Sequence, residues 1–137
     1  MPLKKMEHYL VLTDDLESTR RFYCDVLGLK QGFRPELTFP GYWLYLGDTP
    51  CIHVGEWDAY IVWTREAGIP VSSRAAGTGP LDHIAFNATG YDETVERLEQ
   101  LGIEASRNEL DDIGLRQLFI RDPNGLMIEL NFREKPA

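Results

Sequence analysis

The sequence has little cysteine, little positive charge and no long apolar run, and each shortage excludes a class of protein. Its two cysteines, Cys24 and Cys51, are too few for a disulfide framework and lack Cys-x-x-Cys spacing. Lysine and arginine number 14 against 22 acidic residues, and the net charge of −8 disfavours nucleic acid and anionic membranes as partners. No apolar stretch approaches the roughly 20 residues that a membrane-spanning helix needs. The N-terminal residues also lack the apolar segment of a secretory signal, so the expected location is the cytoplasm.

What the sequence does contain is the same order of predicted elements twice. Apolar periodicity and turn residues predict a strand, a helix and three strands in the first half, over 4–13, 16–27, 29–34, 42–46 and 51–55. The same order is predicted in the second half, over 81–88, 91–101, 103–107, 116–121 and 126–130. Asp14 and Asp15 offer an N-cap for the first helix, and Gly28 a stop. We therefore expect an α+β protein built from two tandem βαβββ modules.

At 137 residues the chain is expected to form a single domain. We place the first module at about 4–55, a linker at about 56–80 and the second module at about 81–132. The linker carries Trp57, Tyr60 and Trp63, which is unusually aromatic for a connection. The pattern of residues 60–66 leaves a helix and a strand open. A long connection of this kind is often a functional loop or a surface-covering segment.

The repeat also relates the polar residues inside the predicted strands. His83 lies 75 residues after His8, each in the first strand of its module, and Glu129 lies 76 residues after His53, each in the last strand. All three histidines of the chain therefore occupy repeat-matched positions together with one glutamate. Glu129 stands between Ile128 and Leu130, just after the Asp-Pro-Asn-Gly turn, so strand alternation places it on the face opposite those apolar residues.

Imidazoles and a carboxylate on one sheet face suit a divalent metal: Zn, Ni, Mn, Co or Fe(II). Two histidines and one carboxylate with open positions are the ligand type of non-haem Fe(II) oxygenases. The sequence therefore predicts a metal site built from His8, His83 and Glu129, with His53 beside it. It does not select among these metals.

These features together resemble the vicinal oxygen chelate superfamily from about residue 4 to residue 132. The resemblance is carried by the duplicated element order, by His8 ahead of Phe22-Tyr23-x-x-Val26-Leu27-Gly28, by His83 in Asp-His-Ile-Ala-Phe, and by Asp-Pro-Asn-Gly leading to Glu129. The superfamily includes glyoxalase I, fosfomycin and bleomycin resistance proteins, methylmalonyl-CoA epimerase and extradiol dioxygenases. The resemblance implies an eight-stranded, incompletely closed barrel with a central cleft, a metal at its centre, and a homodimer.

The resemblance also implies roles for the matched residues. His8, His83 and Glu129 match the shared two-His-one-Glu ligand set. His53 stands where glyoxalase I has a glutamate that is both ligand and base, where the epimerase has a glutamine, and where extradiol dioxygenases have an acid–base histidine. His53 is therefore either a fourth ligand or a second-sphere proton carrier, and His53 and Glu129 are the candidate catalytic residues.

Departures from the family patterns order the alternatives. Extradiol dioxygenases place a tyrosine ten residues before the ligand glutamate, where this chain has Phe119. Fosfomycin resistance proteins carry a serine-rich potassium loop where residues 108–115 are acidic and lack serine. Bleomycin-binding members usually lack the metal ligands that this chain keeps. Glyoxalase I differs at His53, which puts its proton-shuttle chemistry in question.

The expected function is that of a metal-dependent lyase or isomerase of glyoxalase type. The metal chelates adjacent oxygens of a small-molecule substrate and stabilises an enediolate-like intermediate. The alternatives are a single-domain Fe(II) extradiol-type dioxygenase and a non-catalytic protein that sequesters a small molecule, as bleomycin resistance proteins do. The sequence does not name the substrate, nor does it say whether the ligands come from one chain or from two.

Four further residues are weaker candidates for the substrate pocket. Trp43 and Tyr45 share one face of the strand before His53, Cys51 shares a face with His53, and Arg121 precedes the last turn. Glu7 and Asp82 directly precede His8 and His83. Strand alternation predicts that they point away from the histidines.

Overall fold

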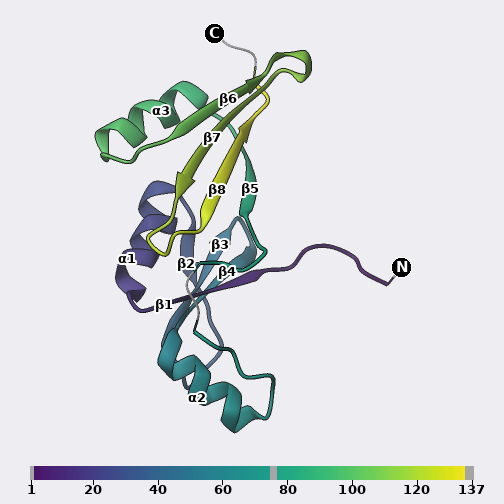
Figure 1. Ribbon diagram of the computed structural model, residues 1–137, viewed down its shortest axis with the longest axis vertical. Helices are drawn as coiled ribbons and strands as arrows, with labels where there is room; N and C mark the ends of the chain where they lie inside the picture. Colours follow the sequence, from purple (N-terminus) through teal and green to yellow (C-terminus); the bar gives the residue numbers. More distant parts are fainter. Residues whose placement is uncertain (1, 75–76, 135–137) are drawn as a thin grey trace. The chain divides into compact units, whose positions relative to one another are not determined.

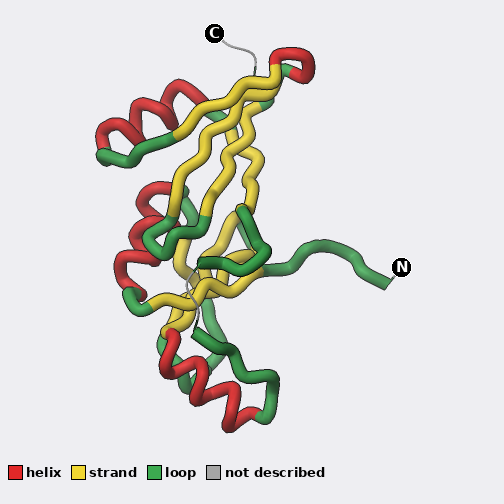
Figure 2. Tube along the Cα trace, in the orientation of Figure 1, coloured by secondary structure: helices red, strands yellow, loops and turns green. Residues whose placement is uncertain are grey.

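Two four-stranded sheets with the same strand order form the framework of the protein (Figures 1 and 2). The computed structural model describes residues 2–74 and 77–134, and the chain divides into two compact units, Met1–Ala75 and Ala76–Ala137. Residues 75 and 76, which belong to the expected linker, lie outside the described residues. None of the helices in the described ranges is long and apolar enough to cross a membrane.

The first unit contains the first βαβββ module and one additional helix. Its elements are β1 (Tyr9–Thr13), α1 (Leu16–Arg21), the π-helical turn η1 (Phe22–Val26), β2 (Lys30–Gly32), β3 (Gly41–Leu46), β4 (Thr49–Glu56) and α2 (Trp57–Ala67). The strand order is β1-β4-β3-β2, with β1 and β4 parallel and the other pairs antiparallel.

The second unit repeats this arrangement. Its elements are β5 (His83–Ala88), α3 (Tyr91–Gln100), β6 (Ser106–Leu110), the 3₁₀ turn η2 (Asp111–Ile113), β7 (Leu115–Arg121) and β8 (Met127–Phe132). The strand order is β5-β8-β7-β6, again with the first pair parallel. Figure 2 shows η2 as the short helical turn that joins β6 to β7. The α+β class and the two βαβββ modules are therefore confirmed, whereas the single domain and the eight-stranded barrel with its central cleft stay predictions.

The register of the parallel strands gives a residue-by-residue measure of the repeat. In the first module His53 lies opposite Leu10, two residues after His8. In the second module Glu129 lies opposite Ala85, two residues after His83. The offset is the same, so the two pairs of candidate ligands occupy equivalent places in the two sheets.

Each sheet has one buried apolar face, as alternation in its strands requires. In β8 the buried residues Ile128, Leu130 and Phe132 alternate with half-buried ones, and the ring of Phe132 meets Tyr91 of α3 edge to face at 5.3 Å. Helix α3 therefore covers the apolar face of this sheet. Glu129 is left on the opposite face, as predicted from its neighbours.

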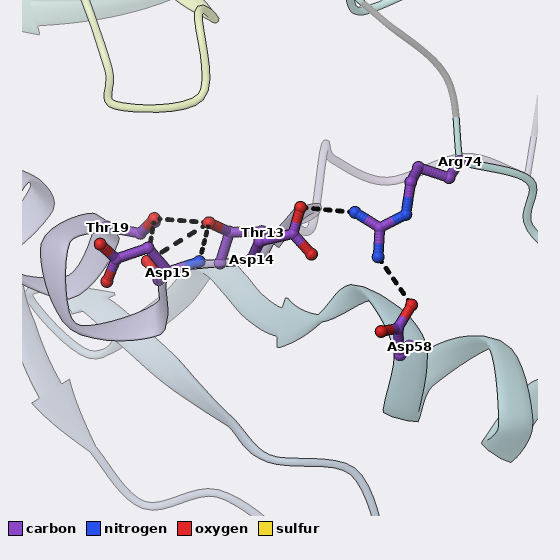
Figure 3. A network of polar contacts seen from close by, with 6 residues as sticks. All are labelled: Thr13, Asp14, Asp15, Thr19, Asp58 and Arg74. Atoms are coloured by element: carbon purple, nitrogen blue, oxygen red, sulfur yellow. Dashed lines mark hydrogen bonds and ion pairs between the residues drawn. The ribbon is translucent and has the colours of Figure 1, made fainter.

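A polar network fixes the turn between β1 and α1 (Figure 3). The hydroxyl of Thr19 donates to Thr13 Oγ1 at 3.1 Å, and Thr13 Oγ1 also accepts from the backbone N–H of Asp15 at 3.0 Å. Asp15, rather than Asp14, caps the helix by accepting from Ser18 N at 3.0 Å. Asp14 is free to pair with Arg74, which also binds Asp58 of α2 at 2.7 Å (Figure 3). Arg74 thus ties the segment after α2 to both ends of the first module.

The turn before Glu129 is built by the carboxylate of Asp122. This side chain is 4% exposed, and its Oδ1 accepts from the backbone N–H groups of Asn124 (2.8 Å) and Leu126 (2.9 Å). Gly125 completes the turn at a φ of 87°, a conformation that glycine adopts without strain. The Asp-Pro-Asn-Gly signal therefore forms the predicted hairpin turn and sets where β8 begins.

Two segments differ from the sequence-based expectation. Residues 60–66, left open between helix and strand, belong to α2, which begins at Trp57 and contacts β4. The strand expected at 103–107 begins instead at Ser106 and continues to Leu110. Every residue of this edge strand is exposed, so burial provides no alternation there from which its bounds could be read.

Candidate functional site

In the first module the two histidines stack on each other. His8 directly precedes β1, and its ring lies 3.8 Å from the ring of His53 in β4, with an angle of 15° between the planes. On its other side His53 stacks on Trp43 of β3 at 4.0 Å and 9°, since Trp43 is its register partner. His53 is thus held between two aromatic rings.

This environment keeps the imidazole of His53 neutral at physiological pH. Burial, followed by the nearby His8, lowers the pKa of His53 to about 4. A neutral imidazole can bind a metal without first losing a proton, and it can accept a proton from a substrate. Both roles that the sequence left open for His53 therefore remain chemically available.

In the second module His83 and Glu129 face each other. His83 is the first residue of β5, and its Nε2 lies 3.6 Å from Oε1 of Glu129 in β8. The Glu129 side chain is only 14% exposed, whereas His83 is 39% exposed. Two donors that bind one metal at about 2.1 Å in tetrahedral geometry lie roughly 3.4 Å apart, so the observed distance suits a shared ion.

A line of side-chain amides crosses the second sheet and ends at Glu129. Asn108 of β6 donates to Oε1 of Gln117 (2.8 Å), and Gln117 of β7 donates to Oδ1 of Asn131 (3.0 Å). Asn131 of β8 then donates to Oε2 of Glu129 (2.8 Å). One carboxylate oxygen is therefore held by the sheet while Oε1 faces His83. No pattern in the sequence singled out these amides, although their alternate positions in successive strands are compatible with a shared face.

The acidic residues that precede the two histidines contact them, contrary to the prediction from strand alternation. Nδ1 of His8 lies 2.9 Å from a carboxylate oxygen of Glu7, and Nδ1 of His83 lies 2.8 Å from one of Asp82. The hydrogen bond to Asp82 raises the pKa of His83. Alternation fails here because neither Glu7 nor Asp82 lies in a strand. A carboxylate on Nδ1 leaves Nε2 for a metal and orients the ring.

The residues present fit a divalent metal by the chemistry of their donors. They supply imidazole nitrogens and a carboxylate oxygen, with a second-sphere carboxylate on His8 and His83. Each module by itself brings two such donors together. Across 2–74 and 77–134, the structure contains no group of three or more His, Cys, Asp or Glu side chains arranged to hold a metal ion.

Of the four weaker pocket candidates, Trp43 lies beside the histidines. It lines a cavity of about 300 Å³ in the first unit together with His8 and His53. Tyr45 instead donates its hydroxyl to the carbonyl of Phe33 at 2.6 Å. Cys51 is half-buried in β4, and burial raises the pKa of its thiol, which disfavours a reactive thiolate.

Arg121 lies on the second unit and is exposed. Its Nη1 donates to the carbonyl of Gly125 at 2.9 Å, across the β7–β8 turn. It borders a hollow of about 750 Å³ whose lining residues include neither His83 nor Glu129. The nearest contact of Arg121 is therefore structural.

The cavity of the first unit also contains residues that the sequence did not mark. Arg34, from the segment between β2 and β3, is one of its walls, and Phe39, Tyr60 and Trp63 form another. The aromatic content of residues 57–63 was a signal for Tyr60 and Trp63. No signal pointed to Arg34, which lies 19 residues before His53 in the sequence.

Comparison with known proteins identifies the family. The sequence model of the glyoxalase/bleomycin resistance protein/dioxygenase superfamily matches residues 5–130. The chain belongs to this superfamily. It is similar to Glyoxylase I 4 of Arabidopsis thaliana, with 31% identity over 132 residues that cover 93% of this chain and 70% of that protein. It is also similar to the uncharacterized protein YaeR of Escherichia coli K12, with 26% identity over 93% of this chain and 95% of that protein.

A solved structure supports the fold of this superfamily member. The lactoylglutathione lyase of Agrobacterium tumefaciens matches with a TM-score of 0.71, covering 96% of this chain and 95% of that chain. The sequence identity is 23%, so this likeness concerns the fold. The resemblance seen in the sequence is therefore confirmed at the level of the superfamily.

Proposed function

We propose that the protein is a divalent-metal-dependent enzyme of glyoxalase type, a lyase or isomerase that acts on a small molecule with adjacent oxygens. His8, His83 and Glu129 are the proposed metal ligands. The observation that carries the proposal is the equal register of the pairs His8–His53 and His83–Glu129 in the two sheets. Four polar side chains at equivalent places, within strands that otherwise pack a core, are more economically explained by a shared ligand than by chance.

The chain's own residues prepare the site for this chemistry. Asn131 fixes one oxygen of Glu129, and the carboxylates of Glu7 and Asp82 orient the imidazoles of His8 and His83. A divalent metal bound there supplies Lewis-acid polarisation of the substrate oxygens and stabilises the negative charge that develops when a proton is removed. His53 is proposed either as a fourth ligand or as the group that carries this proton.

Metal analysis of the purified protein tests the proposal. We expect about one divalent metal per site in protein supplied with metal during expression, and loss of that metal in His8→Ala and Glu129→Ala. Asn87→Ala is a matched control, because Asn87 is exposed on the strand that carries His83. Well-folded wild-type protein without metal contradicts the proposal.

His53→Ala separates the two roles of His53. Greatly weakened metal binding makes His53 a ligand, while retained metal with lost turnover makes it the proton carrier. Turnover is first sought as formation of lactoylglutathione, the product in the name of the Agrobacterium neighbour. Exchange of substrate C–H for deuterium in D₂O, followed by NMR, detects proton removal from other α-hydroxycarbonyl compounds.

The rival functions give different results in the same experiments. An extradiol-type dioxygenase consumes oxygen with catechols when loaded with Fe(II). Phe119 lies directly opposite Glu129 in the sheet and offers no hydroxyl there, which ranks this reaction second. A sequestering protein binds its ligand equally with and without metal and turns nothing over. The proposal also includes a homodimer, which sedimentation velocity tests.

A further inference from the structure

The cavity beside His8 and His53 has one cationic wall and one aromatic wall. Its volume of about 300 Å³ is at the lower end of the range for small-molecule sites. Among the described residues that line it, Arg34 is the one lysine or arginine. The other described lining residues are Glu7, His8, Leu10, Leu37, Phe39, Trp43, His53, Val54, Tyr60 and Trp63.

The aromatic wall is firmly packed. Phe39 is buried, and its ring meets Tyr60 at 5.0 Å and Trp63 at 5.1 Å, while Tyr60 and Trp63 lie 5.7 Å apart. Tyr60 and Trp63 sit one helical turn apart on α2, so the helix presents both to the same place. Such a surface suits the flat face of an aromatic or unsaturated ligand.

Arg34 is held in place but carries a charge that no described side chain neutralises. Its Nη2 donates to the carbonyl of Phe39 at 2.8 Å, and its guanidinium lies 4.8 Å from the Phe39 ring centroid. Its Nε is buried and has no hydrogen-bond partner within the described part of the chain. Burial lowers the pKa of Arg34, which reflects the cost of holding the cation there.

Comparison with Arg116 shows why this matters. Nε of Arg116 also lacks a partner among the described residues, but Arg116 pairs with the carboxylate of Asp92 at 3.8 Å and stacks on Tyr91 at 3.9 Å. Arg34 has no described ion pair, although acidic residues outnumber basic ones 22 to 14 in this chain. A partly buried cation without a counter-ion is costly unless a ligand supplies one.

We propose that this cavity is a substrate subsite in which Arg34 binds the carboxylate of a small aromatic or unsaturated acid. The planar part of the acid lies against Trp43, Tyr60 and Trp63, and the opposite end faces His8 and His53. A carboxylate is preferred to a phosphonate because the guanidinium matches its planar geometry and one cation balances one negative charge. The inference rests on the proposed metal-dependent function only for the reaction at the far end, not for binding of the acid.

Binding of simple probes to the metal-free full-length protein tests the subsite. Sodium benzoate is compared with benzamide, its neutral counterpart, by quenching of tryptophan fluorescence, since Trp43 and Trp63 line the cavity. We expect benzoate to bind roughly 10- to 100-fold more tightly, the range for a charge-assisted hydrogen bond. Equal binding of the two probes, or no saturable binding of benzoate, overturns the inference. Tighter binding of phenylphosphonate than of benzoate overturns the choice of a carboxylate.

Substitutions assign the preference to Arg34. Arg34→Gln should abolish the preference for benzoate, and Arg34→Lys should keep part of it because the positive charge remains. Arg107→Gln is the matched control: Arg107 is an exposed residue of β6 that pairs with Glu99 at 3.5 Å, outside the cavity lining. An unchanged preference in folded Arg34→Gln, or its loss in Arg107→Gln, refutes the assignment. The comparison of benzoate with benzamide in the wild type needs no variant and so does not depend on how Arg34→Gln folds.

Metal content, measured on the same samples, separates this inference from the proposed function. Arg34 is not a proposed ligand, so Arg34→Gln should keep the metal content of the wild type. Bound metal without a preference for benzoate removes the subsite and leaves the metal-dependent function standing. A preference for benzoate in protein that binds no metal removes that function and leaves the subsite standing.

Discussion

Replacing Asn131 with leucine should weaken both the metal site and the second module. The substitution removes the amide that donates to Glu129 Oε2 and also leaves Gln117 Nε2, on a buried side chain, without its acceptor. A hydrogen bond to a charged group contributes about 1.5–3 kcal/mol, and an unsatisfied buried donor costs about 1–3 kcal/mol. Allowing for relaxation of Gln117 towards solvent, we expect the free energy of unfolding to fall by roughly 2–4 kcal/mol. Loss of an outer-shell partner should also weaken metal binding by about 10- to 100-fold.

The assay is urea denaturation of metal-free protein followed by far-UV circular dichroism, with metal affinity from competition against a chelator. Fluorescence is unsuitable because Trp43, Trp57 and Trp63 all lie in the first unit. Asn87→Leu is the matched control, since Asn87 is the register partner of Asn131 on β5 and is exposed. Metal affinity of Asn131→Leu within about twofold of the wild type would refute the role given to the amide line.

Three further predictions follow from the same contacts. Glu7→Gln should weaken metal binding by about tenfold in a chelator competition, because the carboxylate on Nδ1 of His8 orients its ring; wild-type affinity in the variant contradicts this. Asp122→Ala should lower the free energy of unfolding by roughly 2–3 kcal/mol in urea, since two backbone N–H groups lose their acceptor, and a change below about 0.5 kcal/mol contradicts it. Metal-free protein should lose roughly 1–3 kcal/mol of stability as pH falls from about 6.5 to 4, because the unfolded chain protonates His53 before the folded one, whose pKa is about 4. His53→Gln should remove most of that loss in urea titrations at the two pH values, and an equal loss in the variant excludes His53 as its source.

The duplicated framework could be predicted from the sequence because its signals are local. Strand alternation placed Glu129 opposite Ile128 and Leu130, and the Asp-Pro-Asn-Gly turn supplied its own capping carboxylate in Asp122. The equal spacing of the histidine and glutamate positions survived as an equal strand register. Where burial does not alternate, as in β6, the bounds were displaced by three residues.

The rest of the candidate site depends on contacts between side chains from separate segments. Arg34 meets the aromatic wall only because the β2–β3 segment and α2 meet at Phe39, and no periodicity reports that meeting. The helical character of α2 was itself ambiguous in the sequence. The carboxylates of Glu7 and Asp82 were misplaced because alternation was extended past the beginning of the strands. Sequence patterns therefore located the candidate ligands better than the groups that orient them.

The central claim is that imidazole and carboxylate groups from the repeat-matched positions bind the metal. X-ray absorption spectroscopy of protein loaded with one equivalent of Zn²⁺ measures this most directly. The account predicts a first shell of nitrogen and oxygen with at least two imidazoles, and the loss of one imidazole in His83→Ala. A sulfur ligand at about 2.3 Å, the Zn–S distance expected if Cys51 or Cys24 bound the metal, would contradict it, as would a shell without imidazole.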